Sequence, residues 1–479
     1  MNYAIILHVL GWVLKIESAC MIMPLICALI YDEKTSIYTF ALCIAICLVL
    51  GFILNFKKPK SKTMYAKEGF VAVAFSWIIM SLFGCLPFII SGSIPNFVDA
   101  LFETVSGFTT TGASILKDVE ALPKSMIFWR SLTHWIGGMG VLVFLVAILP
   151  LSGSNNMYLI KAESPGPSVS KLVPKVKSTA KILYTIYIIF TIVQTVLLLF
   201  GGLSLFESLT LTFGTVGTGG FTVTNAGIGA YSPYVQIVIT VFMFICGIDF
   251  SIYHLISMKK AKTALKSDEL KGYVSIFVVA TVLIFFTCKG LFRTSGEALR
   301  HVAFQVVSLM TSTGYSTTDF DRWPQFAKTI LIMIMFIGAC AGSTGGGIKV
   351  SRIMILIKTI IKEIRICIHP KNTLKVTMNK RFVEHETIRA VNVFVVSYFM
   401  IMAFSNILIS IDNFDFTTNF TSVLTAMSNM GPGFSKVGPT MNFSIFSPFS
   451  KLVLTFDMLV GRLELFPILI LFSPYTWKK

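Results

Sequence analysis

Long apolar stretches recur along the whole 479-residue chain, separated by short polar or glycine-rich segments. An α-helix needs about 20 mostly apolar residues to cross a bilayer, so each stretch predicts a membrane span. The expected spans are residues 5–30, 37–56, 70–91, 126–151, 182–203, 234–256, 273–292, 326–356, 390–411 and 448–471. The pattern therefore predicts an all-α integral membrane protein with ten transmembrane helices.

Four shorter segments that end in glycine-rich loops lie between pairs of these spans, at residues 96–112, 204–220, 296–314 and 414–433. Their glycines 112, 217, 314 and 431 fall 105, 97 and 117 residues apart. We expect an N-terminal helix pair followed by four pseudo-repeats of helix, pore loop and helix. The predicted boundaries are 1–66, 67–155, 156–258, 259–372 with an interrupting loop at 338–349, and 373–479.

The loops themselves suggest a cation filter. Non-helical backbone at membrane depth is tolerated only where it is buried in protein or lines a water-filled cavity. Short helices are expected at 102–109, 205–213, 303–310 and 420–427, and the negative ends of their dipoles would point toward the membrane centre. Carbonyl rings can then replace the hydration shell of an ion. The candidate filter residues are Thr110, Thr111, Gly112, Val216, Gly217, Thr218, Thr313, Gly314, Asn429, Met430 and Gly431.

The register of the second and fourth loops is open. The second contains Gly217, Gly219 and Gly220. We favour Gly217 because it stands ten residues after Glu207, as Gly112 stands nine after Glu103. In the fourth loop, Pro432 removes a backbone donor.

Charge gives an orientation. The formal net charge is +17, and basic residues gather between 57 and 67, 171 and 181, 259 and 271, and 352 and 389. The positive-inside rule places these loops and both termini in the cytoplasm. The basic residues are not gathered into one domain with interleaved aromatics, so the sequence does not indicate nucleic-acid binding. Acidic residues in the outward loops could attract cations or simply keep the surface soluble.

Composition limits the function classes. Hydrophobic residues make up 54% of the chain, charged residues 13%, and the mean hydropathy is +0.78, as in integral membrane proteins. No Ser, His and Asp constellation or carboxylate pair can be assembled at plausible depth, so we expect no enzyme. The nine cysteines include no CxxC pair, and we expect no cofactor.

The predicted span 326–356 is interrupted by Gly342, Ser343, Thr344, Gly345, Gly346 and Gly347. A phosphate-binding loop would need lysine directly after its last glycine, where Ile348 stands. A flexible intramembrane gate is the favoured hypothesis, and close helix packing is the alternative. We expect Lys349 to reach the cytoplasmic surface.

Arg462 lies inside the apolar run 452–471, and an ionisable residue at that depth usually faces a partner or a pathway. Glu464 is too near in sequence to share its helix face. A structural ion pair of Arg462 with Asp249 or Asp457 is the alternative to a role beside the pathway.

Several motifs together resemble the Trk/Ktr/HKT superfamily of potassium transporters, and within it the membrane subunit of bacterial Trk uptake systems. The resemblance covers essentially the whole chain and rests on residues 106–113, 128–131, 135–140, 339–349 and 461–464.

The resemblance implies potassium uptake across the cytoplasmic (inner) membrane, with K⁺ at Thr111, Gly112, Val216, Gly217, Thr313, Gly314, Met430 and Gly431. It also implies that Arg462 contacts a gate loop at 342–347, that the chain forms a homodimer within membrane lipids, and that a cytosolic nucleotide-binding RCK-type (TrkA-like) subunit regulates it. The alternatives are a sodium-conducting or Na⁺/H⁺-coupled transporter of the same architecture, or a membrane scaffold or receptor that transports nothing.

Overall fold

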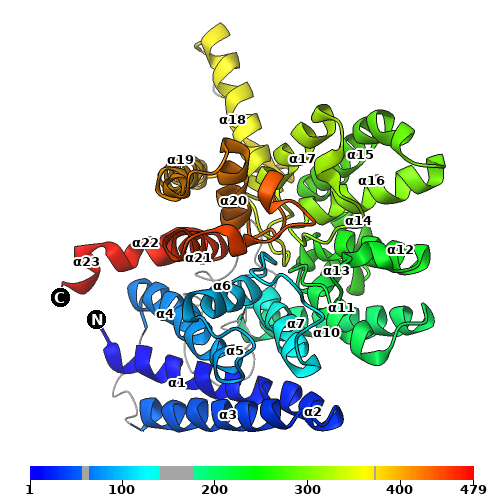
Figure 1. Cartoon of the computed structure of the whole chain (residues 1–479). Helices are drawn as coiled ribbons and strands as arrows, with labels where there is room; N and C mark the ends of the chain where they lie inside the picture. Colours follow the sequence, from blue (N-terminus) through cyan, green and yellow to red (C-terminus); the bar gives the residue numbers. More distant parts are fainter. Residues whose placement is uncertain (57–63, 141–175, 372–373, 479) are drawn as a thin grey trace.

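The computed structural model describes residues 1–56, 64–140, 176–371 and 374–478 (Figure 1). Helices dominate these residues, which confirms the all-α class. The described strands form one small antiparallel hairpin, β1 (Thr377–Met378) with β2 (Arg381–Phe382). The predicted boundary between residues 155 and 156, and the end of the predicted span 126–151, lie outside the described residues.

Six helical segments of the described chain are long and apolar enough to cross a membrane, or seven with one bent pair. Two of the six form the N-terminal pair and four are the outer helices of the repeats. They are α1–α2 (Tyr3–Cys20, Ile22–Ile30), α3 (Lys34–Asn55), α4–α5 (Ala66–Gly84, Leu86–Ile90), α10 (Val176–Phe200), α15 (Asp268–Cys288) with the 3-10 turn η2 (Lys289–Leu291), and α19 (His385–Ile409) with η4 (Ser410–Asp412).

The inner helices of the repeats are divided rather than continuous. The first, α7, is described from Lys124 to Met139, the second bends by 89° between α12 and α13, and the third and fourth break between two shorter helices. Their bounds are α12 (Pro233–Cys246), α13 (Phe250–Ser257), α17 (Gln325–Ile337), α18 (Val350–Ile368), α21 (Pro448–Arg462) and α22 (Phe466–Phe472). The sequence predicted an interruption in the third alone.

Each break has a local cause. Asp249 caps α13 by accepting the backbone N–H of Ser251, which starts a new helix direction. Glu464 and Leu465 both adopt positive φ angles (54° and 68°) before Pro467, and neither conformation continues a helix. Gly338 takes a φ of 73° at the end of α17.

Four short helices lie between the outer and inner members of the repeats: α6 (Phe97–Phe108), α11 (Leu205–Val216), α16 (Ser295–Met310) and α20 (Phe416–Ser428). Side-chain oxygens of Asn96, Ser204, Thr294 and Asp415 cap their N-terminal ends. These caps explain why α6, α16 and α20 begin several residues before the predicted starts at 102, 303 and 420.

The remaining short elements lie in the connections between these helices, except α23, which follows α22 near the C-terminus. They are α14 (Ala261–Ala264), α23 (Pro474–Trp477), and the 3-10 helices η1 (Gly227–Ala230), η3 (Phe320–Arg322), η5 (Ser435–Val437) and η6 (Phe443–Ile445).

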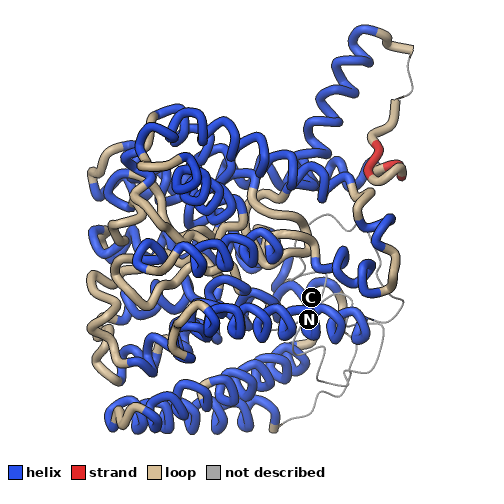
Figure 2. Tube along the Cα trace, turned by 90° about the vertical axis from the view of Figure 1, so that its right-hand side faces the viewer, coloured by secondary structure: helices blue, strands red, loops and turns tan. Residues whose placement is uncertain are grey.

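Both chain ends lie side by side in Figures 1 and 2, and α18 and the β1–β2 hairpin project from the body. Lys67 at the start of α4 donates its Nζ to the carbonyls of Tyr475 and Lys478, 3.1 Å each. The N-terminal pair packs closely, because the carbonyl oxygens of Gly11 and Gly51 each lie 2.9 Å from where a Cβ on the other would stand. Small residues allow such close helix packing in membranes.

Candidate functional site

Four segments at and after the ends of the short helices meet in a closed ring. We call them loop 1 (109–115), loop 2 (217–223), loop 3 (311–317) and loop 4 (428–434). A Cβ on Gly112 would run into the Gly219 carbonyl of loop 2, and one on Gly220 into the Thr313 carbonyl of loop 3. A Cβ on Gly314 would lie 2.9 Å from the Gly431 nitrogen, and one on Gly431 would lie 2.9 Å from the Gly112 oxygen. Glycine is therefore required at each position for the four backbones to approach.

The first three loops share one backbone conformation. In each, the residue two before the ring glycine has a positive φ: Thr110 (56°), Thr218 (56°) and Ser312 (57°). The ring glycines are also left-handed, with φ of 79° at Gly112, 82° at Gly220 and 80° at Gly314.

Hydrogen bonds fix the same register in the loops. Gly112 N–H points to the Ser106 carbonyl (3.4 Å), Gly220 N–H to Gly214 (3.4 Å) and Gly314 N–H to Ser308 (3.2 Å), always six residues back. The loops are thus quasi-equivalent around one axis.

The predicted register of loop 2 is wrong by three residues. Gly217 has a helical φ of −73° at the end of α11, and Val216 is the last residue of that helix, buried beside Tyr187 and Phe250. Gly220 is the ring residue. The error came from matching Glu207 with Glu103, whereas Glu207 forms a capping box with Ser204 at the start of α11.

Loop 4 differs in a way that Pro432 explains. Asn429 is left-handed (φ 51°), like Thr110, and Met430 N–H donates to Thr425 at 2.9 Å. Gly431, however, does not adopt a positive φ among the described glycines, because a residue before proline is pushed toward extended conformations. The Asn429 amide instead donates to Thr111 Oγ1 (3.2 Å) and to the Met458 carbonyl (2.8 Å), joining loop 4 to loop 1 and α21.

Hydroxyls line the inner ends of loops 1 and 3. Thr109 and Thr111 lie 2.8 Å apart through their Oγ1 atoms, as do Thr311 and Thr313. All four side chains are fully buried. The short helices end beside these residues, so the negative ends of their dipoles face the region inside the ring.

Residues 338–349 form a lateral loop that we call the intramembrane loop. The backbone closes behind it, because Ile348 N–H donates to Phe336 (3.1 Å), Lys349 N–H to Ile337 (2.8 Å) and Val350 N–H to Ala339 (3.0 Å). The helices α17 and α18 therefore stay joined while the loop bulges sideways, as in compact Ω-loops.

The intramembrane loop contacts the inner ends of loops 3 and 4. Gly346 N–H donates to Ser312 Oγ at 2.5 Å, and Gly347 N–H donates to the Ser428 carbonyl at 3.0 Å. On another side it contacts the bend between α12 and α13, where Cys340 N–H donates to Gly247 (3.0 Å) and Gly342 accepts from Phe250 N–H (3.1 Å). The loop thus lies directly beneath the ring.

Arg462 joins three of these parts. Its Nη1 donates to Thr110 Oγ1 of loop 1 (3.1 Å) and to the Thr344 carbonyl of the intramembrane loop (3.0 Å). Its Nη2 donates to the Gly137 and Gly138 carbonyls near the end of α7, at 2.5 and 2.9 Å. The negative end of the α7 dipole is a favourable place for a guanidinium.

Lys349 and Glu464 have different partners: Lys349 binds inside the intramembrane loop, and Glu464 pairs with α18. The prediction that Lys349 reaches the cytoplasmic surface is wrong: its side chain is buried and its Nζ donates to the Gly345 carbonyl inside the intramembrane loop. Glu464 turns away from the ring and pairs with Arg352 of α18 at 2.5 Å.

A buried ion pair that the sequence analysis missed joins loops 1 and 2. Arg130 Nε lies 2.5 Å from Glu103 Oε1, and Arg130 Nη1 donates to the Thr222 carbonyl at 3.1 Å. Glu103 also accepts from Ile115 N–H (2.9 Å), and the Arg130 guanidinium stacks over Phe221 at 3.5 Å. Arg130, like Arg462, is an ionisable residue inside an apolar span, and such a residue usually faces a partner or a pathway.

The outer acidic residues have local partners. Asp99 pairs with Lys451 at 2.6 Å and Asp321 with Lys328 at 3.1 Å. Asn225 Nδ2 donates to Asp118 Oδ1 at 2.7 Å, which lowers the pKa of that exposed carboxyl. Lys451 and Lys328 therefore offset part of the negative charge of the outer acidic residues, whereas Asp118 stays negative.

The arrangement defines a class: an all-α membrane protein with four quasi-equivalent re-entrant loops around one axis. The TrkH family model, described as "Cation transport protein", matches residues 36–479. The chain therefore belongs to the TrkH family of cation transport proteins.

Individual relatives are similar to this chain over nearly their full length. The Trk system potassium uptake protein TrkH of Salmonella typhimurium is 34% identical over 489 residues, covering 100% of both chains. TrkG of Escherichia coli, also called a Trk system potassium uptake protein, is 32% identical over 481 residues, 99% of this chain and 98% of that one. The crystal structure of the potassium transporter TrkH from Vibrio parahaemolyticus superimposes with a TM-score of 0.89 at 29% identity, covering 100% of both chains. All three are named as transport proteins.

Proposed function

We propose that this chain takes up potassium ions across the cytoplasmic membrane through the ring of loops 1 to 4. The observation that carries the proposal is the ring itself, in which Gly112, Gly220, Gly314 and Gly431 each abut the backbone of the next loop. Backbone carbonyls from four such loops can replace the hydration shell of K⁺. The ion ligands in this proposal are the backbone oxygens of Thr111, Gly112, Gly219, Gly220, Thr313, Gly314, Met430 and Gly431.

The intramembrane loop acts as the gate in this proposal. Its contacts with Ser312 and Ser428 place backbone beneath the ring, where an ion would leave the loops. Arg462 adds a positive charge at the same level, and a like charge at short range raises the energy of a passing cation.

Rescue of a potassium-uptake-deficient bacterial strain on low potassium tests transport. The full chain should restore growth, and a membrane scaffold or receptor would not. The strain should retain its own regulatory subunits. If the chain inserts normally into the membrane and growth is still not restored, the result would count against transport.

Selectivity separates the potassium proposal from a sodium-conducting alternative. Gly112→Ser places a side chain against the Gly219 carbonyl at a φ of 79°, so we expect the rubidium-to-sodium flux ratio in vesicles to fall. An unchanged ratio would contradict the assignment of Gly112 to the filter.

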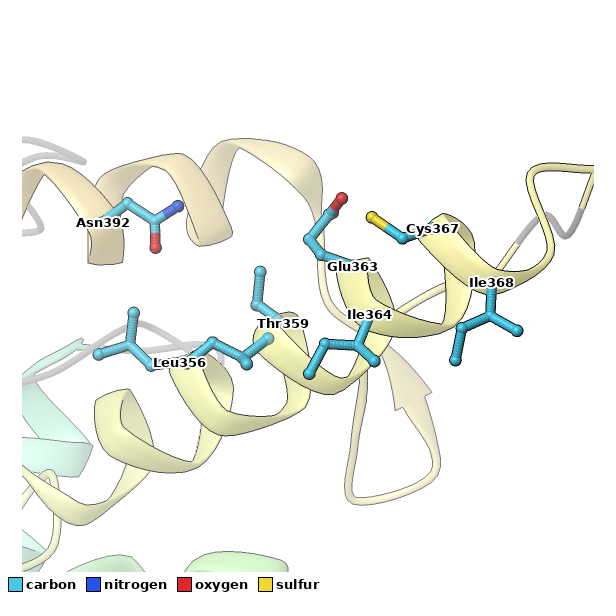
Figure 3. A pocket seen from close by; sticks show the side chains of 8 residues that line it. Leu356, Thr359, Glu363, Ile364, Cys367, Ile368 and Asn392 are labelled. Atoms are coloured by element: carbon cyan, nitrogen blue, oxygen red, sulfur yellow. The ribbon is translucent and has the colours of Figure 1, made fainter.

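We further propose that the chain works as a homodimer in the inner membrane with both termini in the cytoplasm, and with a nucleotide-binding RCK-type regulatory subunit. The projecting helix α18 supports a dimer, since Ile360, Ile364 and Ile368 are 58%, 54% and 65% exposed. Leu356, Ile364 and Ile368 line a shallow groove along α18 together with Asn392 of α19 (Figure 3). A second copy would cover this apolar surface.

A further inference from the structure

One carboxylate holds both ends of the intramembrane loop. Glu269, in the first turn of α15, accepts two backbone N–H groups with the same Oε1 atom. One comes from Ala341, near the start of the loop, at 2.7 Å, and the other from Ser351, in the first turn of α18, at 3.2 Å. Hydrogen bonds to a charged acceptor are stronger than those between neutral groups.

The preceding residue, Asp268, contacts the β1–β2 hairpin and α18. Asp268 Oδ2 accepts from the backbone N–H of Asn379 at 2.9 Å and from Lys358 Nζ of α18 at 3.2 Å. Asp268 N–H donates back to Asn379 Oδ1 at 2.7 Å. Asn379 and Lys380 form the two-residue turn of the β1–β2 hairpin, both with positive φ (51° and 63°), as tight hairpins prefer.

Two adjacent acids on one rigid helix end therefore connect the hairpin and the intramembrane loop. We propose that Glu269 is a positioning residue that holds the intramembrane loop beneath the ring, and that Asp268 couples this hold to the β1–β2 hairpin. A displacement of the hairpin relative to α15 then weakens the hold on the loop. The role of this loop as a gate rests on the proposed function, but its position can be measured without ion flux.

Cys340 is a native reporter of that position, because it lies in the loop with its side chain fully buried. The experiment measures the rate at which a small methanethiosulfonate reagent modifies Cys340 in the full-length protein in vesicles, by mass spectrometry of its peptide. The variants are Glu269→Ala, Glu269→Gln and Asp268→Ala, with Asp319→Ala as a matched control that breaks an exposed ion pair with Arg322.

The two Glu269 variants separate the hydrogen bonds from the charge. The glutamine side chain keeps an Oε1 acceptor but loses the charge, so modification of Cys340 should rise less than in Glu269→Ala. Alanine removes the acceptor, so local opening of the intramembrane loop no longer has to break a charge-assisted hydrogen bond. We therefore expect the rate of Cys340 modification to rise about tenfold. A Cys340 that stays protected in Glu269→Ala, or an equal rise in both variants, would overturn the positioning role.

Asp268→Ala tests the coupling to the hairpin. Hydrogen exchange at residues 377–382 should speed up, and Cys340 modification should rise by a smaller factor than in Glu269→Ala. A loosened hairpin with Cys340 at the wild-type rate would refute the coupling. Rubidium uptake by the same samples is read separately, so a chain that carries no potassium would fail the proposed function without altering the outcome for Glu269.

Discussion

Single glycines decide the register of the ring, and sequence spacing alone could not place all of them. Gly112, Gly314 and Gly431 stand where their loops meet the next one, whereas Gly217 ends α11 and Gly220 takes the ring position. A small residue six positions before the ring glycine would have marked the register in the sequence. It is Ser106 for Gly112, Gly214 for Gly220 and Ser308 for Gly314. Glu103 and Glu207 do not occupy equivalent positions, because Glu103 pairs with Arg130 whereas Glu207 belongs to the capping box of α11.

Two alanine substitutions test this register. Gly220→Ala should lower the rubidium-to-sodium flux ratio, because its Cβ meets the Thr313 carbonyl of the ring. In Gly217→Ala the added Cβ meets the His134 carbonyl of α7, outside the ring. This overpacking should lower the free energy of unfolding by about 1–3 kcal/mol, while the rubidium-to-sodium flux ratio stays near the wild-type value. The reverse pattern would restore the original register.

The ion pair of Arg130 and Glu103 gives a second prediction at this scale. Arg130→Gln leaves the Glu103 carboxylate buried without its cation, which typically costs about 3–5 kcal/mol, and frees the Thr222 carbonyl. We expect a lower melting temperature in detergent together with reduced selectivity. The control, Arg322→Gln at the exposed pair with Asp319, should change neither.

Helices form the next scale, where the pattern of apolar runs was informative about outer helices and less so about inner ones. The outer helices α10, α15 and α19 are continuous because their apolar runs contain no proline, whereas the first outer helix divides into α4 and α5 just before Pro87. The inner break at Glu464–Leu465 rests on two residues with positive φ, and the break between α12 and α13 rests on the N-cap Asp249, so both are too short to leave a gap in hydropathy. Only the long glycine run after Ala341 is visible in the sequence.

The break in the fourth inner helix places Arg462 at the end of α21, and this leads to a prediction. Arg462→Gln removes a positive charge beside the ring; a repulsion of about 1 kcal/mol corresponds to about fivefold in rate. Rubidium uptake should rise by at least that factor with an unchanged selectivity ratio. Deleting residues 342–347 should likewise raise uptake, and a loss of selectivity without a change in flux would argue against a gate.

On the scale of the whole molecule, the described chain is a ring of repeats with one projecting arm. The spacing of the glycine-rich loops predicted the repeats, and the described residues of the basic stretch 352–389 include most of α18, the β1–β2 hairpin and the start of α19. Hydropathy could not show that the isoleucines of α18 point away from the body, because a lipid-facing and a partner-facing apolar stripe have the same composition.

Oligomeric state tests the role of this arm. The double substitution Ile360→Lys and Ile364→Lys puts two charges on the exposed stripe, and we expect the purified protein to run as a monomer in size-exclusion chromatography with light scattering. Leu199→Lys and Phe200→Lys at the end of α10, also exposed, serve as the control and should leave the dimer intact. A dimer that survives in both variants would place the interface elsewhere.

The closure of the backbone behind the intramembrane loop has an energetic meaning. Because α17 and α18 remain hydrogen-bonded to each other across the break, opening breaks the hydrogen bonds of the loop with Cys246, Gly247, Phe250, Ser312, Ser428, Glu269 and Arg462. At about 1 kcal/mol for each of these hydrogen bonds, the closed population exceeds the open one by about 10⁵ if none is replaced. A regulator that binds the open form about 10⁵-fold more tightly than the closed form brings the two populations level without moving a whole helix.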